Sequence, residues 1–267
     1  MLELACISKT FNPGTVNEKK ALSGVALRLE KGDFVTIVGS NGAGKSTPFT
    51  AIAGAFYVDE GAIRLAGEDI TFKPEYKRSR EIGRLFQDPM RGTAPHMTIE
   101  ENLALAYLRT AKNQNAFFSR TSKAEKQFFR DRLALLDMGL EDRMKQPVGL
   151  LSGGQRQALT LLMATLVPPK LLLLDEHTAA LDPSTAEKVL SLTREIVAEH
   201  HITTMMVTHN MKNALELGNR TLMMDSGRVV LDIGGEERKG LTVEDLLKRF
   251  KAGAGRELDN DRILLSE

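Results

Sequence analysis

Residues Gly39–Ser46 are the sequence feature that most constrains the fold, because they read G-S-N-G-A-G-K-S and match the pattern G-x-x-x-x-G-K-[ST]. The apolar, β-branched run Phe34–Val38 comes directly before these residues, and a helical pattern follows them. A buried strand, a glycine loop and a helix, in that order, are the context that this motif requires. We therefore predict an α/β fold in which this strand belongs to a parallel sheet.

The loop also predicts a site for an oligophosphate. Its glycines let successive backbone N–H groups point inward, and the helix N-terminus adds partial positive charge. Lys45 is expected to neutralise the β- and γ-phosphates of a nucleotide, and the Ser46 hydroxyl is placed to bind Mg²⁺. The expected nucleotide-binding residues are Gly39, Ser40, Asn41, Gly42, Ala43, Gly44, Lys45, Ser46 and Thr47.

Pro48 departs from what this loop leads us to expect, because it lies a few residues into the predicted helix. In a helix interior, proline lacks a donor and costs roughly 3 kcal/mol. One interpretation is that the first helical turn accommodates Pro48, as helices commonly accept proline near their start. The alternative is that Pro48 loosens the loop and weakens ATP binding.

Composition excludes several classes of protein. The formal net charge is +1 and 42% of the residues are hydrophobic, which predicts a folded globular chain. Nucleic acid is not an expected partner, since proteins that bind it usually carry a strong basic excess. Cys6 is the only cysteine, so a reducing compartment suits the chain. The longest apolar stretch, Ala51–Val58, has eight residues, whereas a bilayer span needs roughly 20.

Alternation of strand and helix patterns along the chain supports the parallel sheet. Three helical patterns and no strand pattern occur between Thr98 and Val167, which predicts a helical insertion. A last helix is expected after Leu241, with Thr242 as its N-cap and Asp245 in its first turn, followed by a frayed tail. The other predicted strands are Leu2–Cys6, Val25–Leu29, Leu171–Leu174, Thr203–Val207 and Thr221–Met224, and the helices are Ile99–Thr110, Lys123–Asp137, Gln155–Leu166, Ser184–His200 and Asn210–Leu217.

Two carboxylates follow the apolar strand Leu171–Leu174. Asp175 is expected to emerge at the C-terminal edge of the sheet beside the phosphate loop, where it can hold Mg²⁺ through water. Glu176 is then placed to orient an attacking water or accept its proton. An acidic loop after a core strand is the alternative, but the loop at Gly39–Ser46 favours the catalytic interpretation.

The segment Leu151–Gln155 has the sequence L-S-G-G-Q and opens a helix. We call it the signature segment. Taken alone, it predicts a serine-capped helix N-terminus that can bind an anion. Together with the loop and the carboxylate pair, it resembles the ATP-binding subunit of ABC transporters. The resemblance extends from about Met1 to about Ile233 and implies a P-loop NTPase (RecA-like) core, an N-terminal antiparallel β subdomain and an inserted helical subdomain.

The resemblance implies roles for further residues. In that family, the signature segment of one subunit closes over the ATP held by the loop of a second copy, in a head-to-tail dimer. Phe11 matches the aromatic residue that stacks on adenine, with a plain core phenylalanine as the alternative. Gln87 matches the glutamine that contacts Mg²⁺ and the water. The residues expected to contact the γ-phosphate from the second copy are Ser152, Gly153, Gly154 and Gln155, and Asp182 belongs to the loop that crosses the dimer interface.

The five histidines have different expected roles. His209 matches the family's switch histidine, which hydrogen-bonds the γ-phosphate. His200 and His201 close a predicted helix, where a cation suits the C-terminal dipole, and His96 lies in a loop without metal-spaced partners. His177 stands where the family more often has proline. It either makes that loop more flexible or places a second titratable group near the γ-phosphate.

The expected domains follow from the same resemblance. Residues 1–240 form the nucleotide-binding domain, with residues 1–87 and 168–240 as its core and residues 88–167 as its helical subdomain. Residues 241–267 form the C-terminal helix and tail. The chain is expected to bind ATP and Mg²⁺ and to hydrolyse ATP as a dimer.

The resemblance also implies partners. Permease subunits are expected to dock around Gln87–Leu105 and an extracytoplasmic substrate-binding protein to act indirectly, with this chain peripheral on the cytoplasmic face of the cell membrane. The segments Gly83–Pro89, Gly92–Pro95 and Leu174–Asp182 resemble a bacterial subgroup for which aromatic amino acids have been proposed as cargo. The alternative is a soluble ABC ATPase that is not coupled to transport. Paired cassettes and a long coiled coil would indicate that alternative, and neither is present.

Overall fold

The computed structural model describes residues 1–109 and 121–254. These residues divide into two compact units, which are described separately here. Unit 1 contains Met1–Arg78, Leu173–Glu176 and the described chain from His201 onward, and unit 2 contains Ser79–Leu172 and His177–His200. Within the described residues, none of the helices has both the length and the apolar character needed to cross a membrane.

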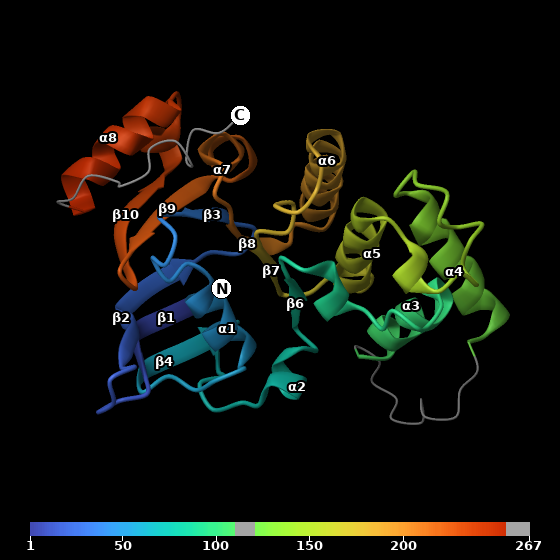
Figure 1. Cartoon of the computed structure of the whole chain (residues 1–267), viewed down its shortest axis with the longest axis horizontal. Helices are drawn as coiled ribbons and strands as arrows, with labels where there is room; N and C mark the ends of the chain where they lie inside the picture. Colours follow the sequence, from blue (N-terminus) through green and yellow to red (C-terminus); the bar gives the residue numbers. More distant parts are fainter. Residues whose placement is uncertain (110–120, 255–267) are drawn as a thin grey trace. The chain divides into compact units, whose positions relative to one another are not determined.

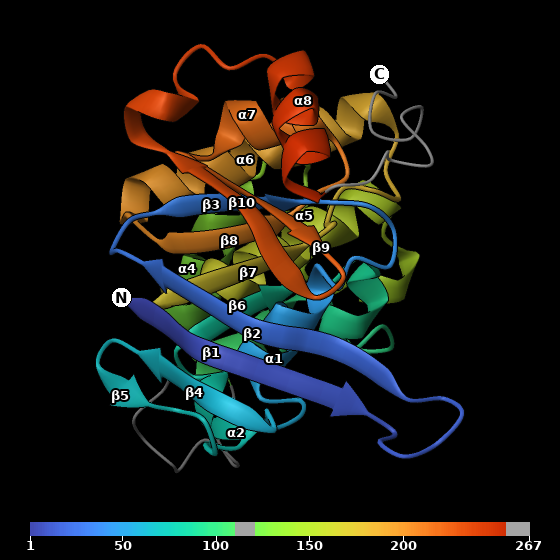
Figure 2. The same cartoon turned by 90° about the vertical axis from the view of Figure 1, so that its left-hand side faces the viewer.

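Unit 1 begins with an antiparallel sheet in the order β2-β1-β4-β5 (Figure 2). Its strands are β1 (Leu2–Phe11), β2 (Lys19–Leu29), β4 (Glu60–Leu65) and β5 (Glu68–Asp69). Leu2 lies opposite both Leu29 and Leu65, and all three side chains are buried. Alternating burial of this kind is why the first two strands were recognisable in the sequence. The strands β4 and β5 were not predicted from the sequence.

The larger sheet of unit 1 has the order β10-β9-β3-β8-β7. Its strands are β3 (Phe34–Val38), β7 (Leu171–Asp175), β8 (Thr203–Val207), β9 (Arg220–Asp225) and β10 (Arg228–Gly234). β3 pairs in parallel with β8 and with β9, and every residue of β3 and β8 is buried. The parallel sheet is therefore confirmed, and β10 is an antiparallel addition that was not predicted.

Two helices pack on this sheet in unit 1, α7 (Met211–Leu217) on β3 and α8 (Val243–Ala254) on β10 (Figure 1). Leu246 and Phe250 of α8 are buried in a cluster with Val38 and Ile233. The Thr242 hydroxyl accepts a hydrogen bond from the N–H of Asp245, as the sequence predicts for the start of α8. The 3-10 helix η4 (Gly235–Arg238) lies between β10 and α8, and most of the predicted tail falls outside the described residues.

A buried arginine fixes the end of α1 (Ser46–Ala53), the helix that follows the glycine loop. Arg78, in the short helix α2 (Glu75–Arg78), is 1% exposed. Its guanidinium donates to the backbone carbonyls of Ala51, Ile52, Thr71 and Lys73. Because two of these carbonyls belong to the last turn of α1, the cation also offsets the negative end of that helix.

Unit 2 is mainly helical. Its elements are β6 (Ile82–Leu85), which lies beside the first residues of β7, the 3-10 helices η1 (Pro89–Gly92) and η3 (Val148–Leu150), and the helices α3 (Ile99–Leu108), α4 (Lys123–Ala134), α5 (Gly153–Thr165) and α6 (Pro183–His200). The helices α3, α4 and α6 all pack against α5 (Figure 1). All four predicted helices of this region are present.

Where the ends of the helices in unit 2 are described, they differ from the prediction by up to three residues. α5 begins at Gly153 and ends at Thr165, against the predicted Gln155–Leu166, and α6 begins at Pro183, one residue before the predicted start. α4 stops at Ala134, three residues before the predicted end, and Asp137 has a positive φ of 49° that no longer fits a helix. The predicted end of the first insertion helix, Thr110, lies outside the described residues. β6 was missed because its four residues are too few to show an alternating pattern. The predicted domain boundaries at residues 87 and 168 stay predictions.

Candidate functional site

The glycine loop follows β3 closely. Gly39 has a φ of +151°, and a Cβ there would lie 2.3 Å from the backbone oxygen of Met224 in the neighbouring strand β9. Gly44 has a φ of +88° and approaches the Ala21 carbonyl. Only glycine fits both constraints, so the loop keeps the tight curvature that turns its N–H groups inward.

Lys45 lies inside this loop and is 7% exposed. Its ammonium donates to the carbonyls of Gly39 and Ser40 at 2.9 and 3.1 Å, and it lies 4.0 Å from a carboxylate oxygen of Glu176. Burial lowers the pKa of Lys45, while the nearby charges of Glu176 and Asp175 oppose that shift. The position of this cation inside the glycine loop places it to bind the phosphates of a nucleotide.

Ser46 and Asp175 form the next contact of the site. The Ser46 hydroxyl donates to Oδ1 of Asp175 over 2.6 Å, which joins the first residue of α1 to the last residue of β7. A serine hydroxyl and a carboxylate are oxygen ligands of the kind that Mg²⁺ prefers. The pair therefore has the chemistry of a magnesium site that a nucleotide's phosphate oxygens and water would complete. Among the described residues, no group of three or more His, Cys, Asp or Glu side chains converges on one point.

Glu176 turns out of the sheet directly after β7. Its φ is +45°, a left-handed conformation that costs a non-glycine residue about 1 kcal/mol and that clusters at functional sites. Its N–H donates to the carbonyl of Val207, the last residue of β8. This hydrogen bond holds the ends of β7 and β8 together, and the Glu176 side chain stays 21% exposed beside Lys45.

His209 follows β8 on the same edge of the sheet. The N–H of Thr208 donates to the Ile37 carbonyl near the end of β3, and the Thr208 hydroxyl accepts from the N–H of Asn210. These contacts hold His209, which is half-buried, in the segment between β8 and α7. The carboxyl ends of β3, β7 and β8 thus bring the loop, both carboxylates and His209 to one edge of the larger sheet, as the sequence predicts.

Phe11 is the last residue of β1, which extends five residues beyond the predicted strand Leu2–Cys6, and it is half-buried. Its ring meets the Phe56 ring edge-on at a centroid distance of 5.2 Å, and the Lys9 ammonium lies 5.8 Å from each ring. The interactions that the structure gives Phe11 are therefore with side chains outside the glycine loop. Stacking of Phe11 on adenine stays a prediction.

The signature segment lies in unit 2 and starts α5. The Ser152 hydroxyl accepts from the N–H of Gln155, and the Gln155 side chain accepts from the N–H of Ser152, which forms a capping box. A Cβ on Gly154 would lie 2.0 Å from Cγ2 of Thr185, whereas a Cβ on Gly153 would make an ordinary 3.5 Å contact with Leu181. Gly154 is needed for close packing of α5 on α6, and nothing in the sequence marks Thr185 as its neighbour.

Three other residues singled out from the sequence also belong to unit 2. Asp182 is exposed and its carboxylate accepts from the N–H of Thr185, so it starts α6, and hydrogen bonds from Thr185 lower its pKa. Gln87 follows β6 and is exposed. His177 is 3% exposed, its ring lies 3.3 Å from the Thr193 hydroxyl, and burial lowers its pKa to about 4.

Burial of His177 bears on one of its two interpretations, a second titratable group near the γ-phosphate. A ring with a pKa of about 4 is neutral at physiological pH, so it does not supply a second titratable group there. The first helical turn accommodates Pro48, because α1 begins at Ser46 and Pro48 lies in the first turn, where an N–H has no partner within the helix. The effect of Pro48 on ATP binding stays a prediction.

The model of the family described as "ABC transporter" matches residues 22–179, more than half of the chain, and this range includes the glycine loop, the signature segment and both carboxylates. The chain belongs to the ABC transporter family. It is therefore an ATP-binding subunit of an ABC transporter and an ATPase, and its P-loop NTPase fold is confirmed.

Similar ABC transporter proteins differ in how much of their length the chain covers. A tyrosine transport ATP-binding protein of Clostridioides difficile (strain R20291) is 44% identical over 252 residues, which are 94% of this chain and 99% of that protein. A choline transport ATP-binding protein of Bacillus subtilis (strain 168) is 34% identical over 232 residues, 86% of this chain but 56% of that protein.

A solved structure of this family resembles the chain along nearly its whole length. It is the dimeric post-hydrolysis state of an ATP-binding cassette bound to ADP and Pi, with a TM-score of 0.77 and 26% identity. The alignment covers 90% of this chain and 100% of that one. That relative binds ADP and Pi as a dimer.

Proposed function

We propose that this chain drives amino acid import through an ABC transporter, with an aromatic amino acid such as tyrosine as cargo. The observation that carries the proposal is the end-to-end match to the tyrosine transport ATP-binding protein, 94% of one chain against 99% of the other. The choline transport relative matches over just 56% of its own length. The present chain therefore has the size of the tyrosine transport subunit.

The catalytic residues that we propose are Lys45, Glu176, His209 and Gln87. Lys45 would neutralise the β- and γ-phosphates from inside the loop, since it is already held there by the carbonyls of Gly39 and Ser40. The Glu176 carboxylate would accept the proton of the water that attacks the γ-phosphorus. The Glu176 side chain is 21% exposed at the edge of the sheet, and its N–H is hydrogen-bonded to the Val207 carbonyl. Both observations support this role.

A magnesium ion fits the oxygen atoms of Ser46 and Asp175, and we propose that these two residues hold it together with Gln87. The support is the 2.6 Å contact between the Ser46 hydroxyl and the Asp175 carboxylate, which sets two oxygen donors side by side. The ion supplies charge neutralisation of the phosphate oxygens during transfer. The His209 ring, on the same edge, would donate a hydrogen bond to the γ-phosphate.

The active form that we propose is a head-to-tail dimer. The capping box engages the N–H groups of Ser152 and Gln155, so the N–H groups of Gly153 and Gly154 are those at the start of α5 that would contact the γ-phosphate of the other copy. Asp182 would lie at the interface, and Phe11 would stack on adenine. The similar cassette bound to ADP and Pi is dimeric, which supports a dimer here.

The partners that we propose are permease subunits that dock around Gln87–Leu105, with an extracytoplasmic binding protein that delivers the cargo. The chain would then lie peripherally on the cytoplasmic face of the membrane. Support comes from the transport names of the relatives and from η1, a short 3-10 helix that presents Met90 to solvent.

Uptake by a reconstituted system tests the proposal. The chain, its permease and its binding protein would be assembled in proteoliposomes with ATP on the side of this chain, and uptake of radiolabelled tyrosine, choline and sulfate would be measured. We expect uptake of tyrosine alone, and none with Glu176→Gln. ATP hydrolysis without uptake of any amino acid would contradict the transport function and favour an uncoupled ATPase. Uptake of choline or sulfate instead of tyrosine would overturn the cargo alone.

A further inference from the structure

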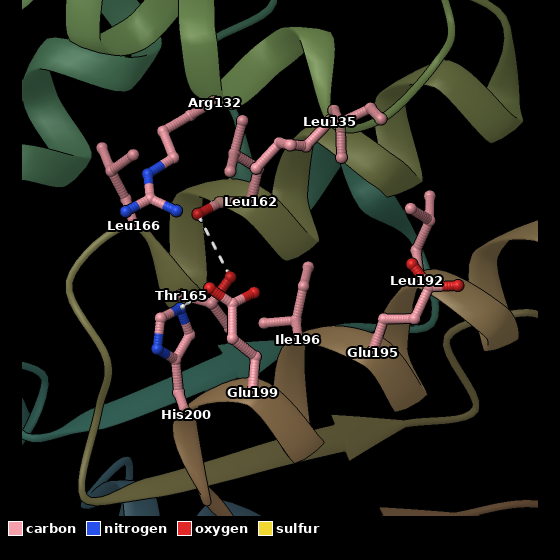
Figure 3. Close-up of a pocket in the computed structure, with 11 residues that line it drawn as sticks. Arg132, Leu135, Leu162, Thr165, Leu166, Leu192, Glu195, Ile196, Glu199 and His200 are labelled. Atoms are coloured by element: carbon pink, nitrogen blue, oxygen red, sulfur yellow. Dashed lines mark hydrogen bonds and ion pairs between the residues drawn. The ribbon is translucent and has the colours of Figure 1, made fainter.

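Unit 2 contains a cavity of about 130 Å³ between α4, α5 and α6 (Figure 3). We call it the α4–α6 pocket. Leu135 is 62% exposed there, so an occupant that covers it would remove apolar surface from water, which is favourable. The aliphatic side chains that line the pocket are Leu135, Leu136, Leu162, Leu166, Leu192 and Ile196.

The volume of the pocket limits what it can hold. An apolar cavity of about 150 Å³ is large enough for one benzene molecule. At about 130 Å³, the α4–α6 pocket has room for one aliphatic side chain of the size of leucine. A nucleotide is too large to enter it.

Arg132 brings an unpaired cation to the pocket. Its guanidinium lies 5.4 Å from the centroid of the Phe128 ring, a cation–π contact that orients the group and leaves its charge in place. Within the described residues, Arg132 makes no ion pair with a carboxylate. Arg130, two residues earlier on the same helix, pairs with Asp142 instead. The donors of Arg132 are therefore available to a carboxylate from outside the chain.

Glu199 and Thr165 bring acceptors to the same pocket. Figure 3 shows the Arg132 side chain extending from α4 and the Glu199 side chain extending from α6. In the described part of the chain, the ion pair of Glu199 is with Nε2 of His200 over 3.9 Å, too long for a hydrogen bond. The Thr165 hydroxyl donates to the Leu161 carbonyl over 2.8 Å, so its oxygen keeps a lone pair. Both oxygens suit an ammonium group.

Charges of both signs decide the chemical class of the occupant. A fatty acid would pair with Arg132 but bring its carboxylate towards Glu195 and Glu199, and an aliphatic amine would pair with Glu199 but face Arg132. A free α-amino acid carries a carboxylate and an ammonium group on one carbon atom, with a side chain beside them. One molecule of this class can therefore pair with each charge and fill the apolar part of the pocket.

We propose that the α4–α6 pocket binds a free α-amino acid with an aliphatic side chain of the size of leucine. Its carboxylate pairs with Arg132, its ammonium group is held by Glu199 and Thr165, and its side chain packs among the leucines. The site belongs to unit 2 and uses none of the proposed catalytic residues. It does not require that the chain drive transport.

Ligands that each lack one group test the assignment. The full chain would be titrated by calorimetry with L-leucine, with 4-methylpentanoate, which lacks the amino group, with 3-methylbutylamine, which lacks the carboxylate, and with L-alanine, which lacks most of the apolar side chain. We expect saturable binding of L-leucine and at least tenfold weaker binding of the other three, since each loses a charge-assisted hydrogen bond or apolar burial. No saturable binding of L-leucine would overturn the proposal, as would equal affinity for all four ligands.

Variants locate the site. Arg132→Gln and Glu199→Gln should each weaken L-leucine binding at least tenfold, whereas Arg130→Gln and Glu187→Gln, outside the pocket, should bind as the parent does. Arg132→Gln should not weaken binding of 3-methylbutylamine, because that ligand has no carboxylate to lose. Thermal unfolding of each variant verifies that it is folded. Parent affinity for L-leucine in both pocket variants would overturn the site and leave the proposed transport function standing.

Discussion

The Ser46 hydroxyl donates a 2.6 Å hydrogen bond to the Asp175 carboxylate, although 129 residues separate them in the chain. The contact joins the start of α1 to the end of β7, so it ties the glycine loop to the strand that carries both carboxylates. It also makes the geometry of the proposed magnesium site dependent on both residues at once. Changes at either residue should therefore affect metal-dependent hydrolysis before they affect the fold.

Asp175→Asn tests this dependence. Asparagine keeps the size of the side chain and can still accept from Ser46, but it removes the charge that would hold the hydrated ion. We expect ATPase activity to fall about 10- to 100-fold at low Mg²⁺, as for outer-shell ligands, and to recover partly as Mg²⁺ is raised. Initial rates of phosphate release over a Mg²⁺ series measure this. Asp142→Asn, at an exposed ion pair with Arg130, is the matched control. A loss that Mg²⁺ does not relieve would argue against a metal role.

Glu176→Gln separates proton transfer from nucleotide binding. The amide is nearly isosteric but cannot accept the proton of the attacking water. We expect hydrolysis to fall on the order of 10²–10⁴-fold while ATP still binds. Light scattering should then detect a stable ATP-bound dimer, since the step that reopens it is blocked. Glu187→Gln, at another position in the chain, should hydrolyse at the parent rate. If Glu176→Gln hydrolyses as fast as the parent, the catalytic assignment is wrong.

Gly154→Ala should destabilise unit 2. The added methyl would lie 2.0 Å from Cγ2 of Thr185, so α5 and α6 must separate. Overpacking of this kind costs about 1–3 kcal/mol, which thermal and urea unfolding would detect. Gly153→Ala is the control, because its methyl would make an ordinary 3.5 Å contact with Leu181.

A double variant shows whether the clash is the cause. Thr185→Ser removes Cγ2, the methyl group that the new side chain at position 154 would strike, and leaves the hydroxyl in place. Gly154→Ala combined with Thr185→Ser should therefore regain most of the lost stability. Equal stability of Gly154→Ala and the parent would mean that α5 and α6 are less tightly packed than the structure shows.

The sequence predicted most of the site because its chemistry resides in contiguous motifs at the ends of strands. Gly39–Ser46, Asp175 and Glu176 each follow a buried apolar strand, and parallel strands carry their C-terminal ends to one edge. His209 follows β8 in the same way. Local pattern and topology together were enough to bring these residues to one place.

Contacts between segments remote in sequence were not predictable. The approach of Gly39 to Met224 and the packing of Gly154 on Thr185 depend on how neighbouring elements are spaced, and no local pattern encodes that spacing. Arg78 looks like one more surface charge in the polar run 77–81, yet it is buried among backbone carbonyls.

His177 should make the stability of the protein depend on pH. The Thr193 hydroxyl donates its own proton to the Val189 carbonyl, so the His177 ring donates to it through Nε2. Because burial depresses the folded pKa from 6.5 to about 4, stability is fully present above pH 6.5 and is lost as pH falls towards 4. The loss amounts to about 3 kcal/mol. Urea unfolding between pH 4 and 7 should show a flatter profile for His177→Gln and an unchanged one for His96→Gln.

Pro48→Ala should leave ATP affinity within about twofold of the parent. α1 begins at Ser46, so the N–H that alanine restores at its third position has no carbonyl partner in the helix, and the proline ring meets no carbonyl four residues back within it. Pro48 is also buried in the first turn, so it is accommodated rather than strained. Stability should fall by about 0.4–1 kcal/mol, because alanine gives the unfolded chain more freedom. Calorimetric titration with ATP and urea unfolding measure the two effects separately. Tighter ATP binding by Pro48→Ala would instead mean that proline weakens the loop.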